Sequence, residues 1–289
     1  MKKILIVGAD GQLAFDLIRV LKQDYEVIEA QHSDFDITDF RKTRDFIRDK
    51  NPDIVLNTAA YNKTEEAERD PEESFRVNAV GAYHVAHAAA DAGADIFYFS
   101  TNYVFDGTKE AFNEEDHPHP LNVYGASKYA GENLTAIAND KAFIIRTSNL
   151  FGLHPGSKSN FPMMMIGKAK NGEDIKVVND QFGCPTYAFD LASKIKELID
   201  RNIHPGTYHI ANSGSCSWYE FAQKIFDLSG LHPRALIPIS TAQSGSIIKR
   251  PHSTALVSKN LPPLDIAPLR PWDSALAAYI KEIKEYAIP

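Results

Sequence analysis

The sequence contains only two cysteines and no long hydrophobic run. Cys184 and Cys216 lie far apart and form no Cys-x-x-Cys pair, which is typical of a reducing compartment and offers no framework of disulfides or metal ligands. The apolar run behind the basic N-terminus ends at Val7, too early for a signal peptide or a membrane span. We therefore expect a cytoplasmic protein with no membrane partner and no bound metal.

The sequence also has no excess of positive charge, because acidic residues outnumber basic ones. Lysine and arginine number 31 against 38 aspartates and glutamates, and the formal net charge is −7. General nucleic-acid binders need a basic surface to displace counterions, so we expect no nucleic-acid partner. An anionic small molecule would have to be held by local basic residues. The composition is compatible with a monomer or a homodimer.

Short β-branched runs alternate with helical periodicity in the first half of the chain. We expect strands at 3–7, 26–29, 54–57, 95–100 and 142–146, and helices at 13–21, 40–50, 75–92 and 127–139. This alternation predicts an α/β fold with a doubly wound parallel sheet of the Rossmann type. Glycine, proline and short elements become frequent after residue 151. We expect a first domain over 1–150 and a smaller α/β substrate domain over 151–289, with segments such as 206–211 as candidates to return to the first.

A glycine-rich turn follows the first expected strand and opens the first expected helix. Gly8 allows a tight turn, Gly11 lets the backbone approach a diphosphate, and Ala14 stands where the third glycine of a dinucleotide-binding loop is common. Gln12 and Leu13 then begin the helix beside the phosphates. Glycines at such a turn often serve the turn alone, but the strand-loop-helix context favours a dinucleotide cofactor.

The end of the second expected strand carries no acid at residues 31–33. NAD-preferring folds usually have one there, bound to the adenosine ribose. Gln31 therefore favours NADP, although NAD remains a possible cofactor. Asp36 and Ile37 are expected to border the adenine, against the alternative that they form a plain surface turn.

Tyr124 and Lys128 lie four residues apart and so share one helix face. A phenol with a pKa near ~10 is a poor proton donor at neutral pH unless a neighbouring cation stabilises its phenolate. Lys128 would supply that cation and lower the pKa of Tyr124. Thr101 ends the strand before this helix, which should bring its hydroxyl to the carboxyl edge of the sheet. This position favours a catalytic role for Tyr124 and Lys128 over the alternative that they form a plain pair on a solvent-exposed helix.

Eight segments occur in an order that resembles the dTDP-4-dehydrorhamnose reductase family of extended short-chain dehydrogenases. They are GADGQLA, NTAAYNKTEEAE, VNAVGA, STNYVFDG, PLNVYGASKYAGE, RTSNLFG, NDQFGCPTY and GTYHIANSGSCSWYEFA. The resemblance implies NADPH-dependent reduction of the 4-keto group of a nucleotide-linked deoxysugar, dTDP-4-dehydro-L-rhamnose to dTDP-L-rhamnose.

The same resemblance implies roles for individual residues. Tyr124 would be the proton donor, Lys128 the cation and a ligand of the nicotinamide ribose, and Thr101 the hydroxyl that orients the carbonyl. The implied cofactor contacts also include Ala59, Ala60, Tyr61 and Asn78, with Asn78 behind Lys128. On the substrate side the resemblance implies contacts from Tyr103 and from Arg250, whose guanidinium can bind a diphosphate in a forked geometry.

Two departures from the family pattern alter the expected sugar pocket. Asn102 and Asn149 stand where family members commonly have an aspartate and a tryptophan, and we expect both to contact the substrate. Some family members dimerise through magnesium bound by acids, but Phe189 occupies one of those positions, which argues against such a dimer. The methionine run 163–165 is expected to be helix core.

Two other functions remain as alternatives. The β subunit of methionine adenosyltransferase, a non-catalytic NADP-binding regulator, resembles the same family and also reads S-N-Y-V-F-D-G, so Asn102 favours it. Retention of Thr101, Tyr124 and Lys128 favours an enzyme instead. A 4,6-dehydratase would need an Asp-Glu pair directly after the threonine. This chain has Asn102 and Tyr103 at those two positions, so it offers no carboxylate there.

Overall fold

A six-stranded parallel sheet forms the centre of the molecule. The computed structural model describes residues 1–154 and 160–286. The strand order is β11-β6-β4-β3-β1-β2, and every neighbouring pair is parallel. The strands are β1 (Lys3–Val7), β2 (Glu26–Ala30), β3 (Ile54–Asn57), β4 (Asp95–Thr101), β6 (Ala142–Thr147) and β11 (Gly206–His209). The predicted α/β class with a doubly wound sheet is confirmed.

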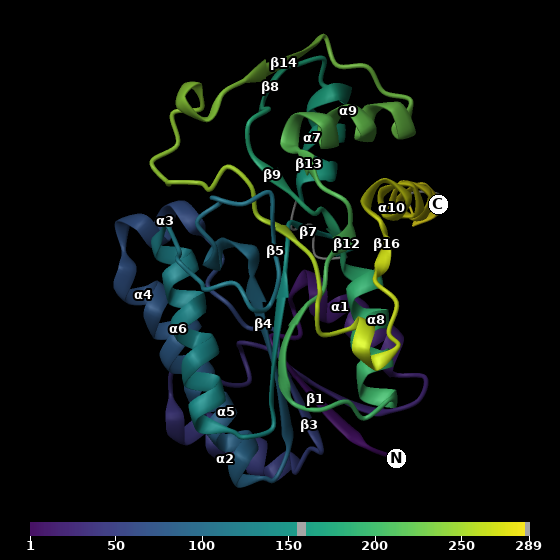
Figure 1. Cartoon of the computed structure of the whole chain (residues 1–289). Coiled ribbons are helices and arrows are strands. Elements are labelled where there is room, and N and C mark those ends of the chain that lie inside the picture. The colour runs from purple at the N-terminus through teal and green to yellow at the C-terminus, as the bar shows by residue number, and fades with distance from the viewer. Residues whose placement is uncertain (155–159, 287–289) are drawn as a thin grey trace.

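Helices cover both faces of this sheet (Figure 1). One face is covered by α1 (Gln12–Leu21) and α8 (Ala188–Asp200), which pack against each other. The other face is covered by α2 (Phe40–Lys50), α5 (Ala82–Asp91) and α6 (Val123–Ala138). The inner strands β1 and β3 are buried on both faces as a result, which explains why their sequences are apolar without alternation.

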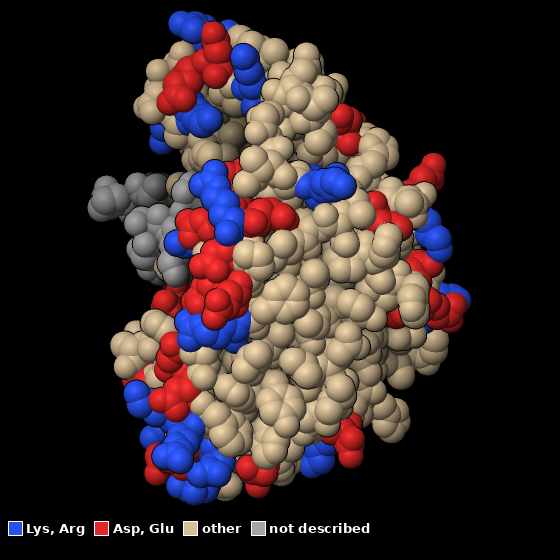
Figure 2. All heavy atoms as spheres, turned by 90° about the vertical axis from the view of Figure 1, so that its left-hand side faces the viewer, with Lys and Arg blue, Asp and Glu red and all other residues tan. Residues whose placement is uncertain are grey.

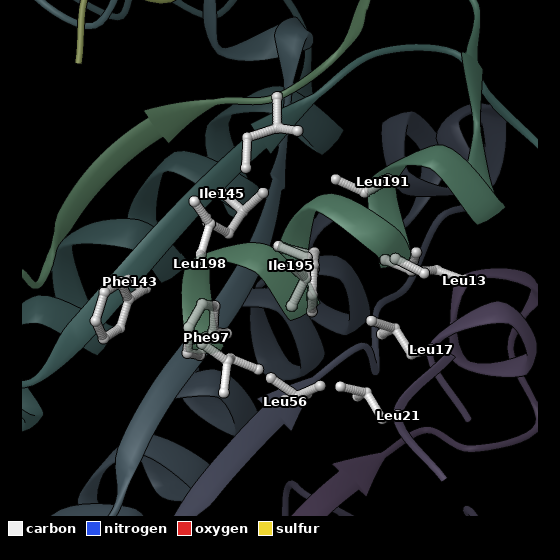
Figure 3. Close-up of a cluster of buried hydrophobic side chains, with 14 of the residues drawn as sticks. Leu13, Leu17, Leu21, Leu56, Phe97, Phe143, Ile145, Leu191, Ile195 and Leu198 are labelled. Carbon is white, nitrogen blue, oxygen red and sulfur yellow. The ribbon is translucent and has the colours of Figure 1, made fainter. Parts of the chain in front are cut away.

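The largest cluster of buried side chains lies between the sheet and the pair α1 and α8. Figure 3 shows Leu13, Leu17 and Leu21 of α1 directed at α8 and at the strands. They face Leu56, Phe97 and Ile145 of the sheet and Leu191, Ile195 and Leu198 of α8. Leu17 and Leu56 are fully buried. Truncating such a leucine to alanine costs about 2–5 kcal/mol. This packing therefore holds the glycine turn, which lies directly before α1, in a fixed position.

The helix expected over 75–92 is interrupted. The chain forms α4 (Pro71–Phe75), a π-helix (Arg76–Gly81) and then α5. The wider π-turn presents the carbonyl of Asn78 to the Tyr98 hydroxyl at 2.9 Å. Gly81 lies so close to Ile37 that an added Cβ would come within 2.7 Å of its side chain. Tertiary contacts thus override the simple helical period.

Helix α6 begins four residues earlier than predicted, at Val123 rather than at residue 127. Asn122 caps it, because the Asn122 Oδ1 accepts a hydrogen bond from the Gly125 N–H at 2.8 Å. The early start puts Tyr124 in the first turn of the helix. Tyr124 therefore lies next to the end of β4 rather than along the flank of the sheet.

The rest of the second half forms a smaller lobe with its own buried cluster. Its helices are α7 (Phe161–Lys170), α9 (Trp218–Ser229) and α10 (Trp272–Tyr286), and its longest strand pair is β8 (Asp174–Val178) with β14 (Ala235–Ile239). Four further strand pairs of the described residues are short. The parallel ones are β7 (Leu150–Phe151) with β10 (Thr186–Tyr187), β12 (Asn212–Ser213) with β16 (Leu269–Pro271), and β15 (Ala255–Leu256) with β5 (Ala111–Phe112) from the first half of the chain. The pair β9 (Phe182–Gly183) and β13 (Cys216–Ser217) is antiparallel.

Short helices complete the described residues 1–154 and 160–286. They are α3 (Thr64–Arg69) and 3₁₀ turns at Asn102–Val104, Thr241–Gln243 and Pro262–Leu264.

The chain passes more than once between the central sheet and the smaller lobe. Helix α8 covers one face of the sheet, and β11 extends its edge beside β6. A division at residue 150 stays a proposal, and it would have to assign these two elements to the first unit.

Charged side chains of both signs lie mixed along the margins of the face shown in Figure 2, and the middle of that face is largely uncharged. No continuous basic surface is visible there. Within the described ranges 1–154 and 160–286, no helix is long and apolar enough to cross a membrane.

Candidate active site

The turn between β1 and α1 contains two glycines, Gly8 and Gly11. Gly8 has a φ of +81°, and an added Cβ would lie 2.8 Å from the Ala59 nitrogen. Gly11 is the N-cap of α1, and the first turn of that helix contains no acidic residue. A helix N-terminus attracts anions through its free N–H groups and its dipole. This turn therefore fits the diphosphate of a dinucleotide, with Gln12 and Leu13 contributing backbone because Leu13 is buried in the core.

The loop after β3 lies beside this turn and connects it to α6. Asn78 exchanges two hydrogen bonds with Tyr61: the Asn78 Oδ1 accepts from the Tyr61 N–H at 2.8 Å, and the Asn78 Nδ2 donates to the Tyr61 carbonyl at 2.9 Å. The same Nδ2 donates to the Ser127 Oγ at 3.0 Å. Asn78 thus fixes the loop that contains Ala59 and Ala60 against the residue next to Lys128.

The loop expected to border the adenosine part of the cofactor follows β2. Gln31 is exposed and Ile37 is buried, while the Asp36 Oδ1 accepts hydrogen bonds from both the N–H and the hydroxyl of Thr38. The Asp34 carboxylate accepts from the Gln31 N–H at 2.7 Å. A carboxylate therefore lies beside Gln31 although residues 31–33 contain no acid.

Tyr124 and Thr101 meet at the carboxyl edge of the sheet. Burial raises the pKa of Tyr124 to about 12, although a hydrogen bond with the Thr101 side chain acts in the opposite direction. The Thr101 Oγ1 also accepts from the Tyr103 N–H at 3.2 Å, which holds the hydroxyl in place. Tyr124 therefore keeps its proton at neutral pH, as a proton donor must.

Lys128 is almost completely buried, and its Nζ lies 4.1 Å from the centroid of the Tyr98 ring. Burial lowers the pKa of Lys128 to about 7, and the Glu132 carboxylate opposes this effect. The expectation that Lys128 lowers the pKa of Tyr124 is not met in this structure, because the effect of burial on the phenol dominates. Position, by contrast, agrees with expectation: both side chains come from one face of α6.

Asn102 lies inside the protein rather than at the wall of a pocket. Only 2% of its surface is exposed, and its Nδ2 donates to the Ser148 Oγ at 2.9 Å and to the Thr254 Oγ1 at 2.6 Å. Its Oδ1 accepts from the Thr101 hydroxyl at 3.2 Å. The expected substrate contact by Asn102 therefore becomes a structural contact that holds Thr101.

The other residues expected to contact the substrate lie in two different places. The Arg250 Nη1 donates to the Tyr103 hydroxyl at 2.7 Å, and the Tyr103 ring lies edge-on to the ring of Tyr124 at 6.2 Å. Asn149 has a left-handed φ of +44° and packs its amide against Gly183, where an added Cβ would come within 2.5 Å of the Asn149 Nδ2. Tyr103 thus connects Arg250 to Tyr124, whereas the Asn149 amide lies against the backbone of β9.

An open cavity of about 560 Å³ lies between α7, β8 and the segment that contains Arg250. Its lining includes Glu65, Phe161, Met164, Met165, Lys168, Lys176, Gln181, Trp218 and Arg250. Apart from Arg250, no member of this set was predicted as a site residue. The combination of two aromatic rings with two lysines was the signal that could have found them. The expectation for the methionine run is wrong in part: Met165 is buried, but Met163 and Met164 are 43% and 42% exposed, and Met164 lines the cavity.

A second cavity, of about 290 Å³, lies at the β11 edge of the sheet and is lined mostly by apolar residues such as Leu256, Leu261 and Ile266. None of the predicted catalytic residues lines it. Among residues 1–154 and 160–286, no three His, Cys, Asp or Glu side chains are placed to hold a metal ion.

Known proteins match this chain over nearly its whole length. A family model described as the RmlD substrate binding domain matches residues 1–285. The spore coat polysaccharide biosynthesis protein SpsK of Bacillus subtilis (strain 168) is 38% identical over 284 residues, 98% of both chains. A dTDP-4-dehydrorhamnose reductase of Aggregatibacter actinomycetemcomitans is 36% identical over 302 aligned positions, covering 99% of this chain and all of the relative.

The solved structures agree with the sequence relatives. The crystal structure of dTDP-4-dehydrorhamnose reductase from Bacillus anthracis str. Ames in complex with NADP superposes with a TM-score of 0.93 at 37% identity, covering 98% of this chain and 100% of that one. The Aggregatibacter relative and the Bacillus anthracis structure are both named as reductases, so the regulatory alternative is not favoured.

Proposed function

Because the chain belongs to the dTDP-4-dehydrorhamnose reductase family, we propose that it reduces the 4-keto group of a nucleotide-linked deoxysugar with NADPH, and that dTDP-4-dehydro-L-rhamnose is the sugar. The observation that carries the proposal is the contact of the Tyr124 and Thr101 side chains at the carboxyl edge of the sheet, with Lys128 on the same helix face. The Tyr124 hydroxyl would donate to a ketone oxygen at this edge, and the Thr101 hydroxyl lies beside it.

The cofactor would extend from the glycine turn toward Tyr124. Gly8 and Gly11 would leave room for its diphosphate, and the N-terminus of α1 would face the phosphate charge. Bound NADPH supplies the hydride for the carbonyl carbon. Between these two ends the cofactor would pass the loop that contains Ala59, Ala60 and Tyr61. Asn78 fixes this loop through its two hydrogen bonds with Tyr61.

Proton transfer belongs to the protein side chains. The Tyr124 Oη donates its proton to the ketone oxygen, so that the sugar leaves as an alcohol, and Thr101 orients that oxygen. Lys128 carries the positive charge that stabilises the phenolate left behind. Because burial lowers the pKa of Lys128 to about 7, its ammonium can then release a proton to the phenolate near neutral pH and restore the phenol, and the neutral amine takes up a proton from solvent before the next turnover.

The nucleotide part of the substrate would occupy the 560 Å³ cavity. Arg250 connects this cavity to the catalytic edge, since it lines the cavity and donates to the Tyr103 hydroxyl. The guanidinium and the two lysines of the lining, Lys168 and Lys176, suit a diphosphate. Phe161 and Trp218 offer flat apolar surfaces for a base.

The test is a panel of dTDP-, UDP-, GDP- and CDP-linked 4-ketosugars, followed by NADPH consumption and by identification of the product alcohol. We expect clear turnover of one member, dTDP-4-dehydro-L-rhamnose, and loss of turnover in Tyr124→Phe. Preference for another nucleotide or sugar would correct the substrate alone. Tight NADPH binding without turnover of any member would support the regulatory alternative instead.

A further inference from the structure

We propose that Tyr98 is a positioning residue for Lys128: its ring face binds the ammonium, and its hydroxyl holds the backbone on both sides of the site. This inference rests on the proposed function, in which Lys128 assists Tyr124. The sequence gives no reason to place Tyr98 in the site.

The ring contact comes from two buried side chains. Tyr98 and Lys128 are each 1% exposed, and the Lys128 Nζ lies 4.1 Å from the centre of the Tyr98 ring. This distance is well inside the range for a cation on an aromatic face, and the attraction is stronger where water is excluded. The ring thus offers a negative surface to the ammonium without a second ionised group.

The hydroxyl contact reaches two other elements. The Tyr98 Oη donates to the Asn78 carbonyl in the π-helix at 2.9 Å and lies 3.3 Å from the Lys128 carbonyl in α6. Gly131 lets α6 approach, because an added Cβ there would lie 2.1 Å from the Asn78 oxygen and 2.3 Å from the Tyr98 Oη. Tyr98 therefore joins β4, the π-helix and α6 at the turn that carries Lys128.

The charged neighbours of Lys128 do not replace this contact. Glu132, on the same helix, is paired with Arg146 of β6 through two hydrogen bonds of 2.9 and 2.7 Å, and it also accepts from the Ser100 hydroxyl of β4. Much of its charge is thereby balanced. The π-helix contributes the neutral Asn78, and α6 contributes the phenol of Tyr124. Burial raises the pKa of Tyr98 well above its ordinary value, so this ring stays neutral.

Two substitutions separate the ring from the hydroxyl. Tyr98→Phe keeps the aromatic face and removes the donor to Asn78, whereas Tyr98→Leu removes the face. The titration of Lys128 is followed by NMR of its ε-carbon in protein labelled with ¹³C-lysine, and the signal is assigned with Lys128→Arg. We expect Tyr98→Phe to titrate like the parent and Tyr98→Leu to titrate about 0.5 to 1.5 pH units lower.

A third variant covers the case in which Tyr98→Leu does not fold. Incorporation of pentafluorophenylalanine at position 98 keeps the size and shape of the Phe variant and reverses the charge distribution of the ring. Its Lys128 titration should fall below that of Tyr98→Phe. A midpoint equal to that of Tyr98→Phe would overturn the proposal, because it would mean that the ring fills space only.

The same variants are compared by the pH profile of kcat/KM with the ketosugar. We expect the limb assigned to Lys128 to move in the same direction as the NMR midpoint, while a purely structural role would change the height of the profile and leave its midpoints in place. The NMR titration needs no turnover, so absence of activity in the parent would contradict the proposed function and leave the Tyr98 contact to be judged on its own.

Discussion

The Asn102 Nδ2 donates a hydrogen bond of 2.6 Å to the Thr254 Oγ1, a residue 152 positions away. This contact ties the loop after β4 to the segment that follows Arg250. The Asn102 Oδ1 accepts from the Thr101 hydroxyl at the same time, so the amide holds both hydroxyls.

The first prediction concerns this contact. Asn102→Ala and Thr254→Val should each lower the free energy of unfolding by about 1–3 kcal/mol, because each leaves a buried polar partner without its hydrogen bond. In a double-mutant cycle followed by urea unfolding, the two should be coupled by about 1 kcal/mol. The control pair is Asn102→Ala with Thr108→Val, whose hydroxyl is exposed and bonded to Asp106 instead. Additive losses for Asn102 and Thr254 would contradict the contact.

Tyr124→Phe should lower kcat by about 10²- to 10⁴-fold, the usual contribution of a general acid, and should leave NADPH affinity nearly unchanged. The variant keeps the ring and loses the proton that the ketone oxygen needs. Stopped-flow turnover and a fluorescence titration of NADPH measure the two effects. Tyr129→Phe makes the same change one residue beyond Lys128 and should retain parental kcat. Near-parental turnover of Tyr124→Phe would remove the proton donor from the proposed mechanism.

Lys128→Ala should reduce both kcat and NADPH affinity. Because Tyr124 and Lys128 serve one proton transfer, the double variant should be little slower than the slower single variant. The measurement is a double-mutant cycle in kcat at saturating NADPH and ketosugar. Losses that multiply would indicate two independent roles.

NADPH should bind more tightly than NADH, since residues 31–33 contain no acid to repel a 2′-phosphate. Each tenfold preference corresponds to about 1.4 kcal/mol. The Asp34 carboxylate, bonded to the Gln31 N–H, limits this preference, so Asp34→Asn should strengthen NADPH binding and affect NADH less. Parallel fluorescence titrations at fixed salt would show both effects, and equal affinity for the two cofactors in the parent would refute the argument.

Asp16 should make the protein less stable as the pH rises. Burial raises the pKa of its carboxyl to about 7 against the attraction of Arg19, whereas an unfolded aspartate titrates near ~4. Between these values the native state holds a proton that the unfolded state has released, so stability falls with increasing pH, by as much as about 4 kcal/mol in total. Asp16→Asn removes this loss.

Urea unfolding at pH 5 and pH 8 measures the difference. The gain of Asp16→Asn over the parent should be larger at pH 8, and the exposed Asp49→Asn on α2 serves as a control in which no such gain is expected. An equal effect of Asp16→Asn at both pH values would mean that the carboxyl stays ionised across this range.

The sequence by itself determined five of the six strands of the central sheet and the helical spacing of Tyr124 and Lys128. Periods of hydrophobicity are local, so the five strands of the first half and the pairing of Tyr124 with Lys128 on one helix face follow from residues close in the chain. The glycine turn is equally local, because Gly8 needs a positive φ whatever surrounds it. The domain boundary and the individual roles of the site residues remain predictions.

Only the tertiary structure decided which side chains surround these local features. The sequence treated Asn102 as a pocket residue, but its partners Ser148 and Thr254 come from elements that meet only after folding. Tyr98 looks like one more apolar strand residue until α6 brings Lys128 over its ring. The pKa values of Tyr124 and Lys128 were likewise beyond a spacing argument, because burial, and not the distance along the helix, is the largest cause of both shifts.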